Sequence, residues 1–449
     1  MNSENIATPI TACVIHPDLS SNRRRNGAGK HDQPTATKFA AGRACEAKLE
    51  EAVGLAGAIG LEITYCAVIQ IPRIRPATLF GSGKVEQISK TIGMHHAGVV
   101  IVDGALSPVQ QRNLERAWDC KVIDRTALIL EIFGARARTR EGKLQVELAA
   151  LSYQRSRLVR SWTHLERQRG GFGFLGGPGE TQIESDRRQL RERIARLKRE
   201  LNDVARTRSL HRAARHRVPH PVVALVGYTN AGKSTLFNQL TGAEVDVKNQ
   251  VFATLDPTMR GLTLPSRRRV ILSDTVGFIS ELPHDLVAAF RATLEEVSEA
   301  DLILHVRNIS HVETAQQRRD VHAVLAELGL EDKVSAGLVE VHNKLDLLDQ
   351  DAHDQFAAAA EQSSSNVAIS ALRGEGLDRL LSLIDRKLSA DREVVTPKIN
   401  LTDGAMIAWL YRHGEVLNRS DDDLHAHFRV SLTPADAERL SRLRRNGQQ

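Results

Sequence analysis

Cysteine is scarce in this sequence, and long apolar runs are missing. Only 4 cysteines occur in 449 residues, without CxxC spacing or clustered histidines: Cys13, Cys45, Cys66 and Cys120. This argues against a disulfide framework and against a cysteine-bound zinc site. No segment approaches the roughly 20 apolar residues of a membrane span, and the start MNSENIATPI lacks the charged-then-apolar order of a secretion signal. We therefore expect a cytoplasmic protein without stable membrane insertion. We also expect a monomer.

The composition is that of a folded protein with several domains. Apolar residues make up 41% of the chain and charged residues 26%, which are ordinary globular proportions. At the usual domain size, this length predicts about three or four units. The stretch SNRRRNGAGKHDQPTATK near the N-terminus has no apolar periodicity, so we interpret residues 1–35 as a flexible segment.

Positive charge is concentrated in one region. The whole chain has a net charge of +6, whereas the segment from 151 to 217 alone contains 17 Lys and Arg against 7 Asp and Glu. Such a concentration indicates a polyanionic partner, and its alternative is a solvated helix surface.

Residues 36–135 show an α/β pattern. The short β-branched runs LEITYCAVIQI, AGVVIVD and CKVID alternate with amphipathic stretches, which predicts a small domain with a parallel sheet. GSGKVEQ, starting at Gly81, imitates a phosphate-binding loop, but it lacks Ser or Thr after Lys84 and has Thr78 in place of the first glycine. A nucleotide site here is therefore the weaker alternative.

Residues 136–217 carry two heptad stripes. Apolar residues recur at spacings of three, four and seven in two runs: Leu144, Leu148, Leu151, Leu158, Trp162, Leu165 and then Ile183, Leu190, Ile194, Leu197, Leu201, Val204. Between the runs, RGGFGFLGGPGE cannot continue a helix. We predict an antiparallel hairpin of two helices of about 30 residues. Its glycine-rich tip loop, with Phe172 and Phe174, fits contact with structured RNA, and the alternative is a long mobile connection.

The motif GxxxxGK[ST] follows the apolar run VVALV and precedes a helix-like segment. That order of strand, turn and helix is the one that a phosphate loop needs. Its two glycines let the backbone amides point at the phosphates, the lysine supplies positive charge to the β and γ oxygens, and the serine hydroxyl provides one ligand of Mg²⁺. The expected nucleotide contacts of this loop come from Gly227, Asn230, Ala231, Gly232, Lys233, Ser234 and Thr235.

The tetrapeptide NKLD, which starts at Asn343, indicates which base is bound. The carboxylate of Asp346 can accept two hydrogen bonds from the N1–H and amino groups of guanine, a donor pair that adenine lacks. We place Lys344 along the ribose and the phosphate loop. Ser370 and Ala371 of ISAL can add backbone amide contacts to the guanine oxygen. The expected ligands are therefore GTP and GDP.

VILSDTVGF supplies a metal ligand and a switch. Asp274 is expected to hold Mg²⁺ through water, and the Gly277 amide can meet the γ-phosphate. In the upstream stretch NQVFATLDPTMRG, Thr254 is our choice to reach Mg²⁺ when the γ-phosphate is present, and Thr258 is its rival. The predicted metal site therefore consists of Ser234, Thr254 and Asp274.

These motifs together resemble a translation-factor-class GTPase, and SPVQQRNLE, VIDRTALIL, RARTREGKLQVELA and GPGETQIESDRR resemble the HflX family. The second resemblance spans roughly residues 77–392. It implies GTP hydrolysis and binding to the ribosome, chiefly to its large subunit and rRNA. It also implies a hairpin that reaches toward the peptidyl transferase region, and a role in splitting or rescuing stalled ribosomes under stress. The tip loop departs from the family form, with GFGFLGG where another basic residue is common before GPGE.

Phe278 stands where Ras-like proteins have the glutamine that orients the attacking water. Phenylalanine cannot hydrogen-bond water, so either another group positions the water or hydrolysis stays slow until a partner completes the site. The resemblance implies that this partner is the ribosome, and we expect hydrolysis that is slow alone and stimulated by it. Asn230 is a candidate K⁺ ligand by similarity to other GTPases, and its alternative role is to cap the loop. We assign Lys233, Thr254, Gly277 and Asn230 to catalysis.

The complete prediction is an α/β protein with a P-loop GTPase domain. Its parts are a flexible segment (1–35), an N-terminal α/β domain (36–135), a helical hairpin (136–217), the GTPase domain (218–391) and a small C-terminal α/β appendage with a tail (392–449). Two alternatives stay open: an ATP-dependent RNA remodeller that uses the N-terminal domain, and a binding module that the nucleotide orders without significant turnover.

Overall fold

The computed structural model describes most of the chain: residues 10–19, 36–168, 178–215, 220–242, 258–279, 296–331, 338–389, 393–432 and 434–446. Thr254 and the tip loop from 169 to 177 lie outside the described residues. The predictions for Thr254, Phe172 and Phe174 therefore stay predictions.

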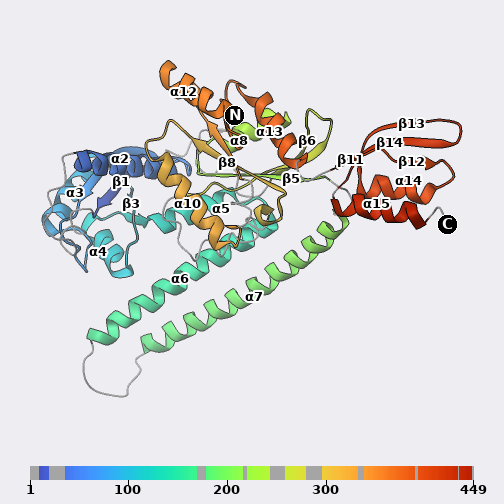
Figure 1. Ribbon diagram of the computed structural model, residues 1–449. Coiled ribbons are helices and arrows are strands. Elements are labelled where there is room, and N and C mark those ends of the chain that lie inside the picture. Colours follow the sequence, from blue (N-terminus) through green and yellow to red (C-terminus); the bar gives the residue numbers. More distant parts are fainter. Residues whose placement is uncertain are drawn as a thin grey trace, which may run out of the picture.

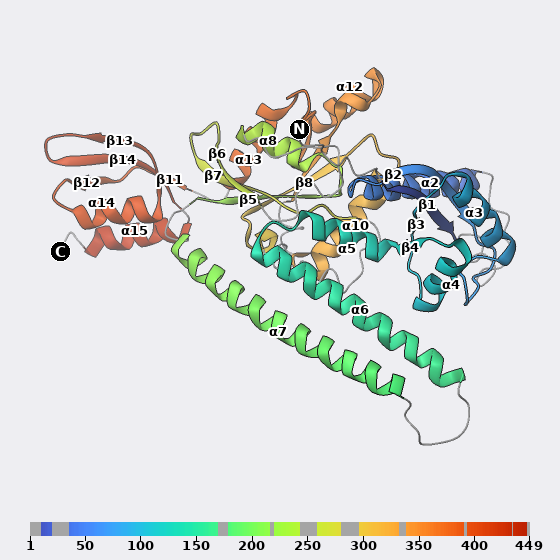
Figure 2. The same ribbon diagram turned by 180° about the vertical axis from the view of Figure 1, so that it is seen from behind.

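In the described part of the chain, three bodies that each contain a sheet lie in a row, and a helical hairpin runs along one side of them (Figures 1 and 2). The N-terminal body lies at one end, the six-stranded sheet lies in the middle, and the C-terminal body lies at the other end. The end of α6 (Arg140–Gln168) and the start of α7 (Pro178–Arg215) lie on the side of the N-terminal body, and α7 runs from there toward the C-terminal body.

The N-terminal sheet is parallel, with the strand order β2-β1-β3-β4. Its elements are β1 (Thr11–Asp18), α2 (Ala36–Gly57), β2 (Glu62–Gln70), α3 (Ser82–Met94), β3 (Val99–Val102), α4 (Pro108–Trp118), β4 (Lys121–Asp124) and α5 (Arg125–Arg136). Two helices begin at side-chain caps: Ser107 accepts from the Gln110 amide, and Asp124 accepts from the Ala127 amide. The predicted parallel sheet is confirmed.

The prediction that residues 1–35 form a flexible segment is wrong for β1. This strand pairs with β2 on one side and with β3 on the other. Ala12, Cys13, Val14 and Ile15 are fully buried. The sequence did not reveal this strand because its apolar run is short and strongly polar residues follow it. The strand is stabilised by pairing with β2 and β3, which lie far away in the sequence.

α6 (Arg140–Gln168) and α7 form the predicted antiparallel hairpin (Figure 1). Ile194 and Leu197, from the expected stripe of α7, are buried. Glu147 of α6 accepts two hydrogen bonds from Arg193 of α7, at 2.7 and 2.9 Å. Apolar burial and the ion pair between Glu147 and Arg193 therefore help to hold the two helices in register.

The base of the hairpin is attached to the N-terminal body. The Tyr153 hydroxyl of α6 donates to the Asp124 carboxylate at 2.7 Å, and Arg157 donates to the same carboxylate at 3.3 Å and to Gln111 of α4. Because Asp124 also caps α5, one carboxylate joins α5 and α6. The direction of the hairpin is thus set by the N-terminal body.

The middle sheet has the order β10-β9-β8-β5-β7-β6, and only β6 runs antiparallel. Its strands are β5 (Val222–Gly227), β6 (Thr258–Thr263), β7 (Arg269–Asp274), β8 (Leu302–Asn308), β9 (Val339–Asn343) and β10 (Asn366–Ala368), and the helices are α8 (Lys233–Thr241), α10 (Thr314–Glu327), α12 (Gln350–Glu361) and α13 (Leu377–Ser389). Alternate residues of β5 belong to different cores: Leu225 packs in the core of α8 and α13, and Val226 packs in the core of α10.

The C-terminal body is an antiparallel sheet with two helices. β14 (His425–Leu432) pairs with β11 (Glu393–Val395), β12 (Lys398–Asn400) and β13 (Glu415–Asp421), beside α14 (Gly404–His413) and α15 (Pro434–Asn446). This completes the predicted α/β fold class, which is confirmed. Within the described ranges, no helix has the length and apolar character to cross a bilayer.

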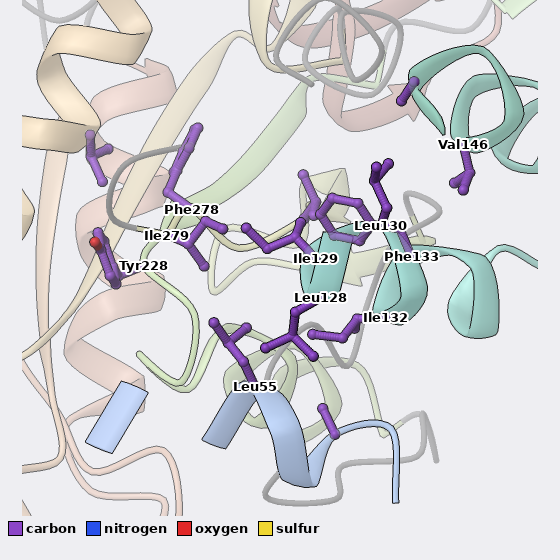
Figure 3. Close-up of a cluster of buried hydrophobic side chains, with 14 of the residues drawn as sticks. Leu55, Leu128, Ile129, Leu130, Ile132, Phe133, Val146, Tyr228, Phe278 and Ile279 are labelled. Atoms are coloured by element: carbon purple, nitrogen blue, oxygen red, sulfur yellow. The ribbon is translucent and has the colours of Figure 1, made fainter. Parts of the chain in front are cut away.

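The N-terminal body and the middle sheet share one apolar core. It contains Leu55 of α2, Ile129 and Phe133 of α5, and Phe278 and Ile279 after β7. Figure 3 shows Ile279 beside Ile129, with Leu128 and Leu55 next to them. The two bodies are therefore held together by apolar burial through α5.

Removing one ring from the shared core should destabilise both bodies. Phe133 is 1% exposed, so Phe133→Ala should cost about 3–5 kcal/mol, because a buried ring is lost and a cavity remains. Urea unfolding followed by fluorescence and circular dichroism measures this cost. The control Leu424→Ala removes an exposed leucine of the C-terminal body and should change stability by less than about 0.5 kcal/mol. Equal effects of the two substitutions would contradict a shared core.

Candidate functional site

The phosphate loop connects β5 to α8, and its glycines allow very close backbone packing. Gly227 has φ 148°, and a Cβ there would lie 2.1 Å from the Val306 carbonyl oxygen. Gly232 has φ 91°, and a Cβ there would lie 2.2 Å from Asn343 Nδ2. Any other residue at either position would clash, so the loop can form only with glycine at both.

Lys233, Ser234, Asp274 and Gly277 lie together at the end of this loop. Lys233 Nζ donates to the carbonyls of Gly227 (3.1 Å) and Tyr228 (2.8 Å). Ser234 Oγ donates to Asp274 Oδ2 at 2.7 Å, and a Cβ on Gly277 would lie 3.0 Å from Lys233 Nζ. Burial lowers the pKa of Lys233 to about 8, against the opposing effect of Asp274. The ammonium group of Lys233, the hydroxyl of Ser234 and the carboxylate of Asp274 therefore lie close together.

Asn343 links the phosphate loop to the loop that contains Ser370 and Ala371. Its Nδ2 donates to the Ala231 carbonyl at 2.8 Å, and its Oδ1 accepts from the Ala371 amide at 2.9 Å. The residue is only 2% exposed. Asn343 thus holds two loops in place, a role that the tetrapeptide alone did not indicate.

Two neighbours of Asn343 are also held by side-chain contacts. Ser370 Oγ donates to Asp346 Oδ1 at 2.6 Å, which orients the carboxylate assigned to the base. Lys344 Nζ donates to Asn230 Oδ1 at 3.3 Å, and burial lowers the pKa of this lysine. Asn230 has φ 57°, a left-handed conformation that asparagine tolerates.

The remaining predicted residues divide into two groups. Thr235 lies in the first turn of α8, directly after Ser234, and so belongs to the same loop end. Thr254 lies outside the described residues. Its rival Thr258 begins β6 and is paired with Asp274 in the β6-β7 ladder. Among the residues that the structure describes, the predicted site residues therefore lie together, and Thr254 stays a prediction.

A segment after β7 is paired directly with the phosphate loop, which sequence reasoning missed. The Phe278 amide donates to the Gly227 carbonyl at 3.0 Å, and the Thr229 amide donates to the Phe278 carbonyl at 2.7 Å. The Phe278 ring is 5% exposed and lies in the shared core. The apolar letters VGFI were the available signal for a buried segment here.

The N-terminal body lies close to the phosphate loop. A cavity of about 170 Å³ is lined by Glu50 and Glu51 of α2 and by Tyr228, Thr229 and Asn230 of the loop, among others. The loop therefore faces both the middle sheet and α2.

Comparison with known proteins assigns the family. Four family models match in succession: GTP-binding GTPase N-terminal (46–134), GTP-binding GTPase Middle Region (136–215), 50S ribosome-binding GTPase (222–344) and HflX C-terminal domain (355–449). The GTPase HflX of Magnetococcus marinus is 48% identical over 400 residues, which cover 88% of this chain and 90% of the relative. The chain belongs to the HflX family of GTPases.

Two further relatives and one solved structure are also similar to this chain. The GTPase HflX of Escherichia coli is 44% identical over 364 residues, 81% of this chain and 84% of the relative. The putative GTP-binding protein 6 of Homo sapiens is 36% identical over 410 residues, 90% of this chain and 75% of the relative. A solved structure, the crystal structure of SsGBP and GDP complex, has a TM-score of 0.47 and 22% identity, and the match covers 84% of this chain and 98% of that one.

The assignment of Asp346 to guanine recognition can be tested by replacing its carboxylate with an amide. Asp346→Asn should weaken GDP binding roughly a hundredfold or more, because two hydrogen bonds to a charged group are lost. It should strengthen binding of xanthosine diphosphate, whose 2-oxo group can accept from the new amide. Calorimetry with GDP and with xanthosine diphosphate measures this change in binding preference.

The matched control is Asp349→Asn, three residues along the chain. Asp349 caps α12 through the Ala352 amide, a role that asparagine can keep. The control should bind GDP as the unaltered chain does. Unchanged preference for GDP in the Asp346 variant would refute the assignment.

Proposed function

We propose that this HflX family protein binds and hydrolyses GTP on the ribosome, mainly on its large subunit, and splits or rescues stalled ribosomes under stress in the cytoplasm. The observation that carries this proposal is the shared core. It joins the segment after the nucleotide loop to α5, and α5 is joined to the basic hairpin. A change at the γ-phosphate can therefore move the element best suited to contact rRNA.

The nucleotide roles follow from the geometry of the loop. Its backbone amides and Lys233 face the phosphates, and Asp346 with the Ser370 loop recognises guanine. Ser234 and Asp274 provide hydroxyl and carboxylate oxygens only 2.7 Å apart, a donor set that suits Mg²⁺. We assign these two residues, with Thr254, to that ion, which when bound would neutralise charge on the β and γ phosphates.

Signal transmission starts at Gly277. When its amide binds the γ-phosphate, the following residues Phe278 and Ile279 must shift with it, because they are adjacent in the chain. Their side chains pack in the core that contains α5, and Asp124 connects α5 to α6. GTP binding and hydrolysis therefore favour different positions of the hairpin.

Slow intrinsic hydrolysis follows from the position of Phe278. Its ring lies in the core rather than at the phosphate, so this residue offers no hydrogen bond to the attacking water. We propose that ribosome binding supplies the missing group. K⁺ at Asn230 would add positive charge near the phosphates, and it requires that Asn230 release Lys344.

Charge on the hairpin supports the choice of partner. Arg191, Lys198 and Arg199 are exposed on α7, whereas Ile194 and Leu197 of the same helix are buried. The family model over the middle sheet is described as a 50S ribosome-binding GTPase. Basic side chains on a long projecting element suit the phosphate-rich surface of rRNA.

The ATP-dependent alternative is disfavoured by the N-terminal body. Ligands of open parallel sheets bind where the strand order reverses, here between the ends of β1 and β3. That position is filled by the protein itself: His16 pairs with Asp103 at 2.8 Å, and Arg125 bridges Asp103 and Glu51. Lys84 instead donates to Gln87. Nucleotide binding is better supported at the phosphate loop.

The decisive measurement is sedimentation with purified large subunits. A nonhydrolysable GTP analogue should raise the bound fraction above that in GDP, and large subunits should accelerate phosphate release. Lys233→Ala should abolish the nucleotide dependence. If large subunits neither bind the GTP-loaded protein nor raise its turnover, the proposal fails. ATP binding that persists in a Lys233→Ala/Asp346→Asn double variant would support the ATP-dependent alternative.

Reversing charge on the hairpin should weaken ribosome binding. Arg191→Glu with Lys198→Glu changes the net charge by −4 and should lower affinity at least about tenfold at low salt, because phosphate contacts are lost. The control Arg386→Glu with Arg429→Glu makes the same charge change on exposed residues of α13 and β14. Equal losses in both variants would show a nonspecific charge effect.

A further inference from the structure

A cluster of polar side chains lies inside the face of the middle sheet that α10 covers. His305 of β8 and Glu340 of β9 are paired across the parallel ladder, and His322 of α10 lies over them. His305 is 1% exposed and the Glu340 side chain is 8% exposed. Neighbouring positions such as Leu304 and Val341 are apolar core. Two buried polar residues in such strands need a compensating interaction.

The two histidines lack that compensation. His305 Nδ1 and His322 Nε2 are buried atoms with no hydrogen-bond partner among the described residues. Each lies 3.5 Å from the same oxygen, Glu340 Oε1. Burial lowers the pKa of His305, which favours the neutral imidazole. A neutral imidazole keeps one nitrogen lone pair that can bind an ion.

Two of the three distances between the candidate ligand atoms fit a bound metal ion. The three ligand atoms all lie within 4.8 Å of one another. Ligand atoms bonded to zinc at roughly 2.0–2.1 Å lie about 3.4 Å apart in a tetrahedron. The two nitrogen–oxygen distances of 3.5 Å are close to this edge, and the third distance, between the two imidazole nitrogens, is within 4.8 Å.

We propose that His305 Nδ1, His322 Nε2 and Glu340 Oε1 form a binding site for a transition-metal dication of the Zn²⁺ class. Two imidazoles and one carboxylate are the donor set that such ions prefer over Mg²⁺ or Ca²⁺. The three ligands come from β8, β9 and α10, so one ion would connect two strands to the helix that covers them.

The surrounding arginines define the fourth position. Arg307 donates to Glu340 Oε2 at 2.8 Å and Arg318 donates to Oε1 at 2.7 Å. The two positively charged arginines already balance the negative charge of Glu340. Glu340 alone therefore cannot neutralise a bound dication. A cavity of about 360 Å³, lined by Arg307, Ala315, Arg318, Arg319 and His322, opens beside the cluster. An anion such as hydroxide or chloride, held by these arginines, completes the coordination from that side.

The site is distinct from the nucleotide site but lies on the same strands. His305 and Glu340 each precede by three residues the ends of their strands, Asn308 and Asn343. Asn343 is the residue that joins the two loops around the nucleotide. An ion at the cluster would therefore stabilise the strand that positions the guanine-binding tetrapeptide.

The test is Co²⁺ titration of the chelator-treated protein, with the nucleotide site saturated by Mg²⁺ and GDP. One equivalent should give the visible absorption bands of tetrahedral Co²⁺ with nitrogen and oxygen ligands. Cysteine coordination would add a near-ultraviolet charge-transfer band, which should be absent. Zn²⁺ should displace Co²⁺ and raise the melting temperature. Absence of tetrahedral bands in the unaltered protein overturns the proposal.

Two variants test whether the Co²⁺ absorption bands arise from this cluster. His322→Ala removes the most exposed ligand and should weaken Co²⁺ binding at least about tenfold, with an unchanged circular dichroism spectrum. His353→Ala removes a histidine of the same body that pairs with Glu375, and it should bind Co²⁺ as the unaltered protein does. Equal binding by the His322 variant, or equal loss in the His353 variant, overturns the assignment. Both outcomes are independent of GTP hydrolysis.

Discussion

Burial of Phe278 and Ile279 in the core of α5 is the interaction on which the working of this protein depends. Burying one such side chain contributes about 1.5–3 kcal/mol, and the coupling energy between two sites of an allosteric protein is typically about 1–3 kcal/mol. Two side chains therefore provide enough free energy to connect the nucleotide with the N-terminal body. The same packing holds the Phe278 ring in the core, where it offers no hydrogen bond to the attacking water, as the proposed slow intrinsic hydrolysis requires.

A second constraint acts inside the nucleotide site. The phosphate loop and the guanine-binding loop come from distant parts of the chain, and Asn343 joins them with both ends of its amide. Gly232 has to lack a side chain because Asn343 occupies the adjacent space. In the proposed site, recognition of the phosphates is thus mechanically linked to recognition of the base, because Asn343 contacts both loops.

The sequence allowed the site to be predicted better than the contacts between bodies. The phosphate loop, NKLD and DTVG are short motifs whose chemistry depends on neighbours in the chain, and the structure brings their described residues together. The role of Asn343, the pairing of Phe278 with Gly227 and the shared core depend on long-range packing. His305 and Glu340 were visible as polar residues within apolar strand patterns, but only the parallel register places them side by side.

The position of β1 affects how the chain can be shortened. A protein that began at residue 36 would keep every nucleotide-binding motif and the whole hairpin. It would lack the strand between β2 and β3, however, and each of these would present a row of unpaired amides and carbonyls. Such open edges recruit strands from other molecules. Loss of the first 35 residues would thus favour aggregation rather than a smaller, independently folded enzyme.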